Sequence, residues 1–140
     1  MTRSKLTLEE FLAIVDGVVQ QLPQPFRPYL QNVAVDVEER PGKQTLRELG
    51  YRPSQWNRLL GLFQGAPLTE QHFGEHHPNR ITLFKQSIEA ACRSRAEMEY
   101  EIRRTLIHEL AHHFGFSEDD LEEFESLPSP FDEGGHEEEP

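Results

Sequence analysis

The sequence lacks the features that define several large classes of protein. It holds one cysteine, Cys92, so neither an intrachain disulfide framework nor a cysteine-rich zinc site can form. No stretch approaches the ~20 apolar residues that a membrane-spanning helix needs. The N-terminus contains no unbroken apolar stretch, so a signal peptide is not expected. By default we expect a cytoplasmic protein that does not bind a membrane.

Basic residues are absent from the C-terminal part of the chain. The formal net charge is −11, and it arises entirely within residues 117–140, which are rich in Asp and Glu and contain no lysine or arginine. The preceding residues carry no net charge, so they offer no excess of basic side chains for binding nucleic acid. We expect a single domain over residues 1–127, followed by a disordered acidic tail over residues 128–140.

The spacing of apolar residues predicts an α+β fold in which one small mixed sheet packs against helices. An N-terminal amphipathic helix is expected over Leu6–Leu22, with Thr7 and Glu10 at capping-box spacing. Gly115 is expected to end a long helix near the C-terminus. After the first helix, the expected order is three strands, this long helix and a short helix: Val33–Val37, Leu59–Gln64, Ile81–Lys85, 96–114 and 118–126.

The long helix carries the sequence His108-Glu109-Leu110-Ala111-His112, which matches the pattern His-Glu-x-x-His. Residues four apart on a helix lie about 40° apart around its axis, so the two imidazoles can bind one ion. Zinc accepts neutral imidazole nitrogens and lowers the pKa of a bound water. Glu109 lies about 100° around the axis from His108. That position suits a general base acting on the water better than a third ligand.

The residues after the motif supply candidates for the third ligand that a catalytic zinc site needs. Gly115 can adopt the left-handed backbone conformation, which turns the chain sharply. The turn can bring Glu118, or alternatively Asp119, back toward the ion. A solvated surface helix would not explain a glycine and a carboxylate at this spacing. The opposite side of the helix carries an apolar stripe for packing, formed by Ile102, Leu106, Leu110 and Phe114.

The motif resembles the elongated metzincin pattern, in which His-Glu-x-x-His-x-x-Gly is followed by a further metal ligand. Glu118 stands at that position in this chain. The sequence is more similar to a family of small bacterial zincin-like metallopeptidase domains, sometimes described as minimal metzincins. The resemblance covers roughly residues 5–127. Three segments carry it: Leu62–Pro67, Pro78–Phe84 and His108–Gly115.

The resemblance implies a zincin-like fold, a Zn²⁺ cofactor and a peptide or protein substrate. It implies that peptide bonds are hydrolysed by a metal-activated water, with Glu109 as the general base. The implied metal ligands are His108, His112 and Glu118.

The same resemblance implies an edge strand beside the cleft that pairs with an extended peptide substrate. We assign this edge to Ile81–Phe84. Thr82 and Phe84 are then the expected substrate contacts.

Two other functions remain compatible with the sequence. A non-catalytic module for metal binding, regulation or protein interaction is favoured by the methionine content, because Met1 and Met98 cannot form the Met-turn of metzincins. A zinc-stabilised structural domain would instead close its site with a fourth ligand from the loop of His72, His76 and His77. Imidazole and carboxylate ligands also suit other divalent ions.

Overall fold

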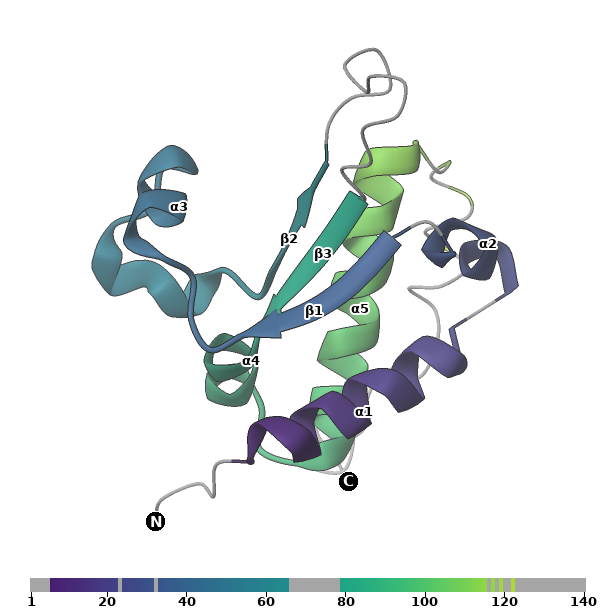
Figure 1. Cartoon of the computed structure of the whole chain (residues 1–140), viewed down its shortest axis with the longest axis horizontal. Coiled ribbons are helices and arrows are strands. Elements are labelled where there is room, and N and C mark those ends of the chain that lie inside the picture. The colour runs from purple at the N-terminus through teal and green to yellow at the C-terminus, as the bar shows by residue number, and fades with distance from the viewer. Residues whose placement is uncertain are drawn as a thin grey trace, which may run out of the picture.

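A computed structural model shows helices packed against a small sheet (Figure 1). The structure describes residues 6–22, 24–31, 33–65, 79–115, 117, 119 and 122. The helix predicted over 118–126 lies mostly outside these residues. The tail predicted over 128–140 and the domain boundary at its start lie wholly outside them. None of the helices in the described ranges is long and apolar enough to cross a membrane.

Helix α1 spans Leu8–Gln20 and confirms the predicted N-terminal helix with slightly shorter bounds. Its capping box is present: the Glu10 amide donates to the Thr7 hydroxyl at 3.1 Å, and the Thr7 amide donates to the Glu10 carboxylate at 2.8 Å. Two short helical segments follow, η1 (Gln24–Phe26) and α2 (Arg27–Leu30). The side of α1 that faces the protein buries Phe11, Ile14, Val15 and Val18.

The sheet has three strands in the order β1-β3-β2. β1 (Val33–Glu38) pairs with β3 (Asn79–Phe84) in parallel, and β2 (Gly61–Gln64) pairs with β3 antiparallel, which confirms the predicted mixed sheet. β3 is therefore the central strand. The assignment of Ile81–Phe84 to an edge was wrong, because β2 covers the side of β3 that was expected to be free.

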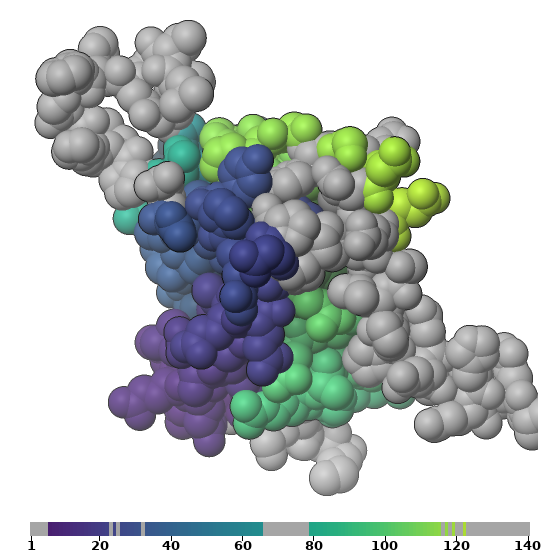
Figure 2. All heavy atoms as spheres, turned by 90° about the vertical axis from the view of Figure 1, so that its right-hand side faces the viewer, coloured from purple at the N-terminus to yellow at the C-terminus, as the bar shows by residue number. Residues whose placement is uncertain are grey.

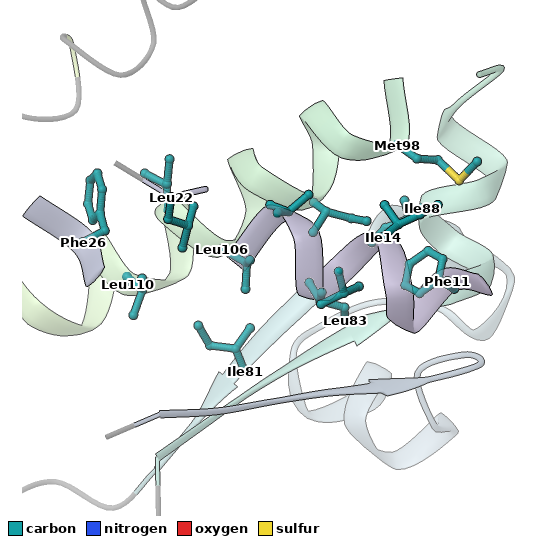
Figure 3. Close-up of a cluster of buried hydrophobic side chains, with 14 of the residues drawn as sticks. Phe11, Ile14, Leu22, Phe26, Ile81, Leu83, Ile88, Met98, Leu106 and Leu110 are labelled. Carbon is teal, nitrogen blue, oxygen red and sulfur yellow. The ribbon is translucent and has the colours of Figure 1, made fainter. Parts of the chain in front are cut away.

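Helices α1 and α5 (Arg95–Phe114) pack together over one face of the sheet, with the main core between them and the strands (Figures 1 and 3). Ile81 and Leu83 of β3 are fully buried there, as are Leu106 and Leu110 of α5. Figure 2 views the right-hand side of Figure 1, where the purple residues of α1 lie near the green residues of α5. The inner side of α5 is thus buried in the core, which fixes the position of the helix.

A smaller cluster lies on the other face of the sheet, at the end of β3. Helix α3 (Lys43–Glu48) and the segment η2 (Pro53–Arg58) cover it, and α4 (Lys85–Ala91) follows β3 directly. The buried residues of this cluster are Leu46, Leu59 and Phe84. Because Leu59 immediately precedes β2, the cluster anchors the start of that strand.

Candidate active site

Local sequence sets the start, the end and the rotation of α5. The Ser94 hydroxyl accepts a hydrogen bond from the Glu97 amide at 3.1 Å and caps the N-terminus. Gly115 ends the helix in the left-handed conformation, with φ of 69°. The helix predicted over 96–114 is confirmed. Its inner side is fully buried at Ile102, Leu106 and Leu110, which leaves the opposite side of the helix available for chemistry.

His108 and His112 project from the outer side of α5, one helical turn apart. Both side chains are exposed, and their ring centres lie 4.7 Å apart. Two imidazoles that each bind the same zinc ion through a nitrogen at about 2.0–2.1 Å have ring centres roughly 5 Å apart. The two rings therefore fit the first two ligand positions of one ion.

The third ligand falls where the structure describes only part of the chain. Glu118 lies outside the described residues, whereas Asp119 is described and exposed. Within the described ranges, no third His, Cys, Asp or Glu joins the two imidazoles in a metal-binding group. The choice between Glu118 and Asp119 stays a prediction from the sequence. The loop of His72, His76 and His77 also lies outside the described residues.

Glu109, the acid of the motif, has a partner in the sheet. Its Oε1 accepts a hydrogen bond from the backbone amide of Phe63 at 3.0 Å. The Glu109 side chain is half-buried and lines the same hollow as His108. A carboxylate that shares a hollow with a metal-binding imidazole is the kind of group that accepts a proton from a metal-bound water.

Within the residues that the structure describes, β2 rather than β3 is the edge strand next to the motif. The Phe84 amide donates to the Leu60 carbonyl at 2.9 Å, so these two residues form a hydrogen-bonded pair. Hydrogen-bonded and non-hydrogen-bonded pairs alternate along antiparallel strands. Gly61 and Phe63 therefore direct their N–H and C=O groups away from β3. The Phe63 amide that meets Glu109 is one of these outward groups.

The predicted substrate contacts Thr82 and Phe84 have no free edge to offer. Thr82 pairs with Asp36 in β1 and with Leu62 in β2, and its hydroxyl donates to the Asp36 carboxylate at 2.9 Å. Phe84 pairs with the strands on either side and is buried in the smaller cluster. The reason is topological: the central strand has its backbone groups occupied on both sides.

A hollow of about 260 Å³ lies between the start of β2 and the outer side of α5. The two elements approach closely at Gly61, where an added Cβ would lie 2.5 Å from the Thr105 methyl carbon. Only a glycine allows this distance, since carbon atoms in contact are normally about 3.5–4.0 Å apart. Side chains that line the hollow include Tyr51, Arg58, Arg104, His108 and Glu109.

Phe63 is a site residue whose role the sequence did not reveal. Its ring stacks on His113, with centroids 3.8 Å apart and planes at 19°, and meets Phe114 edge-on at 6.2 Å. These contacts fix β2 against the end of α5. The only sequence signal was the position of Phe63 within Leu62–Pro67, one of the segments that resemble the zincin-like domains. Nothing in that segment identifies α5 as its partner.

A His-Glu-x-x-His helix beside the free edge of a small mixed sheet defines the zincin class. A family model described as zincin-like metallopeptidase matches residues 30–127, and the chain belongs to this family. The fold is also similar to the solved structure of a conserved hypothetical protein from Thermo thermophilus. That protein is 26% identical, the match covers 78% of this chain and 94% of the other, and the TM-score is 0.53. The search of curated proteins found no match.

Proposed function

We propose that the protein is a zinc-dependent metallopeptidase that hydrolyses peptide bonds, with Glu109 as its general base. One observation carries the proposal: Glu109 shares a hollow with His108, whose ring centre lies 4.7 Å from that of His112, and its carboxylate is held by an outward amide of β2. That arrangement supplies ligands for a metal, a base for water and a backbone edge for a peptide. Membership of the zincin-like metallopeptidase family supports a reaction of this class.

His108 and His112 would hold the zinc ion through neutral imidazole nitrogens. Glu118, or alternatively Asp119, would supply the third protein ligand after the turn at Gly115. When bound, zinc supplies a Lewis acid that makes water a strong nucleophile at neutral pH and polarises a carbonyl oxygen. The side of α5 opposite these ligands is buried, so the metal would bind to a rigid support.

The substrate would be an extended peptide that pairs with the outer edge of β2. Gly61 offers it an outward N–H and C=O, and Phe63 offers its outward C=O, as in strand addition to other sheets; the Phe63 N–H stays with Glu109. Paired in this way, the peptide backbone lies beside Glu109. One oxygen of Glu109 is held by the Phe63 amide, which leaves Oε2 to take a proton from the attacking water and return it to the leaving amine.

A second candidate is a zincin-fold module that binds metal or a partner without turnover. The hydrogen bond between Phe63 and Glu109 favours it in one respect, because the carboxylate already serves to join α5 to β2. In that case Glu109 joins α5 to β2 and has no catalytic role: the wild type would cleave no peptide, and removing the Glu109 carboxylate would only lower stability.

Metal content combined with peptide cleavage tests the proposal. The purified protein is expected to hold one zinc per chain and to cleave members of a broad peptide library. Glu109→Gln should keep the zinc and lose about 10²–10⁴-fold in rate, the usual contribution of a general base. Glu99→Gln is the matched control, since Glu99 lies on the same helix and pairs with Arg95 at the surface, outside the hollow. A protein without zinc, or cleavage that survives in Glu109→Gln, would contradict the proposal.

A further inference from the structure

Two arginines lie at the end of the hollow where β2 begins. Arg58 is the last residue of η2, and Arg104 lies on α5 one helical turn before His108. Residues four apart on a helix share a face, so Arg104 is on the same side as the proposed metal ligands. Both arginines are exposed at this end of the hollow.

The positive charge at this end is only partly neutralised. Arg104 Nη1 lies 3.4 and 3.5 Å from the two carboxylate oxygens of Glu101, beyond the roughly 2.7–2.9 Å of a strong charge-assisted hydrogen bond. The Arg104 side chain keeps 66% of its surface exposed, whereas that of Glu101 keeps 11%. Arg58 has no ion pair or hydrogen bond with any residue that the structure describes. Among the described residues, the Glu101 carboxylate therefore pairs with Arg104 alone, and the guanidinium group of Arg58 faces the hollow without a counter-ion.

The direction of β2 relates this charge to one end of a bound peptide. β2 and α5 run in the same direction, because Gly61 meets Thr105 and Phe63 meets Glu109 further along both elements. Antiparallel pairing is the more stable way to add a strand to a free edge. A peptide paired in this way runs from the end of β2 toward its start, so the residues after the scissile bond reach Arg104.

We propose that Arg58 and Arg104 select peptides that carry a carboxylate on the C-terminal side of the scissile bond. This inference rests on the proposed peptidase function. The carboxylate is either an Asp or Glu side chain or the C-terminal group of the peptide. A guanidinium group binds either one through two parallel hydrogen bonds. Both kinds of carboxylate bind in the same way, and peptides that carry only one of them can show which is selected.

Cleavage of a peptide library by the zinc-loaded full chain gives the first test. Asp and Glu, or a free C-terminus, should be enriched about tenfold within the two positions after the cut, as expected for a charged hydrogen bond gained. Peptides with Asp and an amidated C-terminus are then compared with peptides that have Asn and a free C-terminus, which identifies the source of the carboxylate. Cleavage without any such enrichment overturns the inference and leaves the peptidase function intact. If no member of the library is cleaved, both the inferred preference and the proposed peptidase function are contradicted.

Variants then test the two arginines. Arg58→Gln and Arg104→Gln should each lose most of the preference, and Arg104→Glu should favour Lys at the same position. Arg103→Gln is the matched control, because Arg103 is adjacent in sequence but lies over Tyr100, outside the hollow. The same arginine substitutions are then made in zinc-loaded Glu109→Gln, which binds the selected peptide without cleaving it. Arg58→Gln and Arg104→Gln should weaken this binding, whereas Arg103→Gln should leave it unchanged. An equal loss in Arg103→Gln, or an unchanged preference in Arg58→Gln and Arg104→Gln, would overturn the assignment.

Discussion

Substituting Gly61 tests how closely β2 and α5 must approach for the site to form. An alanine Cβ at this position would lie 2.5 Å from Thr105 Cγ2 and 3.3 Å from the Thr82 carbonyl oxygen. Thr105 is buried, and its methyl group is fixed directly on Cβ, so it cannot swing away as the end of a long side chain could.

The magnitude follows from two opposing effects. Overpacking of this kind costs about 1–3 kcal/mol. Replacing a glycine by alanine also restricts the unfolded chain, which contributes roughly 0.4–1 kcal/mol in the stabilising direction. We therefore expect Gly61→Ala to lower the free energy of unfolding by about 0.5–2 kcal/mol. For a chain of this size that corresponds to a fall in the melting temperature of roughly 2–8 °C.

The assay is a double-mutant cycle with Thr105→Ser, which removes the methyl group that the new Cβ would strike. Thr105→Ser alone should cost about 0.8 kcal/mol for one buried methyl group. The double variant should then be more stable than the sum of the single effects predicts, by about 0.5–2 kcal/mol. Additive effects, or a Gly61→Ala variant more stable than the wild type, would refute the close approach of β2 and α5.

Three further predictions concern the buried ion pair, the metal and the amide at the site. Lys85→Met should lower stability by about 3–5 kcal/mol in urea unfolding, because it removes the cation 3.2 Å from the buried carboxylate of Glu89; a loss below about 1 kcal/mol would show that the pair is not buried in solution. Zinc at 100 times its dissociation constant should stabilise the wild type by about 2.7 kcal/mol, an effect that His112→Ala abolishes and His113→Ala retains in thermal melts. Phe63→Pro should lower kcat more than Phe63→Ala, because only proline removes the amide donor, which points away from the β3 ladder; equal losses would mean that only the ring matters.

The sequence predicted best those elements whose signals are local. The bounds of α5 follow from a run without glycine or proline and from Gly115 at the end, although its cap at Ser94 was not predicted. The capping box of α1 is equally local, since Thr7 and Glu10 are three residues apart. The α+β class also follows from periodicity, because three short apolar strands between helices allow few other arrangements.

The order of the strands could not be predicted, because pairing joins segments far apart in the chain. Ile81 to Phe84 are all buried, a pattern typical of a central strand, yet the resemblance implied an edge strand near the cleft and these residues were assigned to it. Helix α4 was missed because β3 leads into it without a glycine, a proline or a side-chain cap at Phe84. The bond between Phe63 and Glu109 spans 46 residues and has no local signature.

The candidate metal ligands follow from helix periodicity, but their surroundings do not. Spacing alone places His108 and His112 on one side of α5, and the structure sets their ring centres 4.7 Å apart. The hollow beside them depends on Gly61 meeting Thr105, which is a consequence of tertiary packing. The two arginines enter the hollow from elements that are distant in sequence.

An anomalous difference map at the zinc absorption edge, from crystals of the full chain grown with zinc, tests the central claim most directly. We expect one strong peak within about 2.0–2.1 Å of a nitrogen of both His108 and His112, with a carboxylate from the segment after Gly115 as the third protein ligand. A map with no peak between these two rings, or with the zinc held elsewhere, would contradict the account.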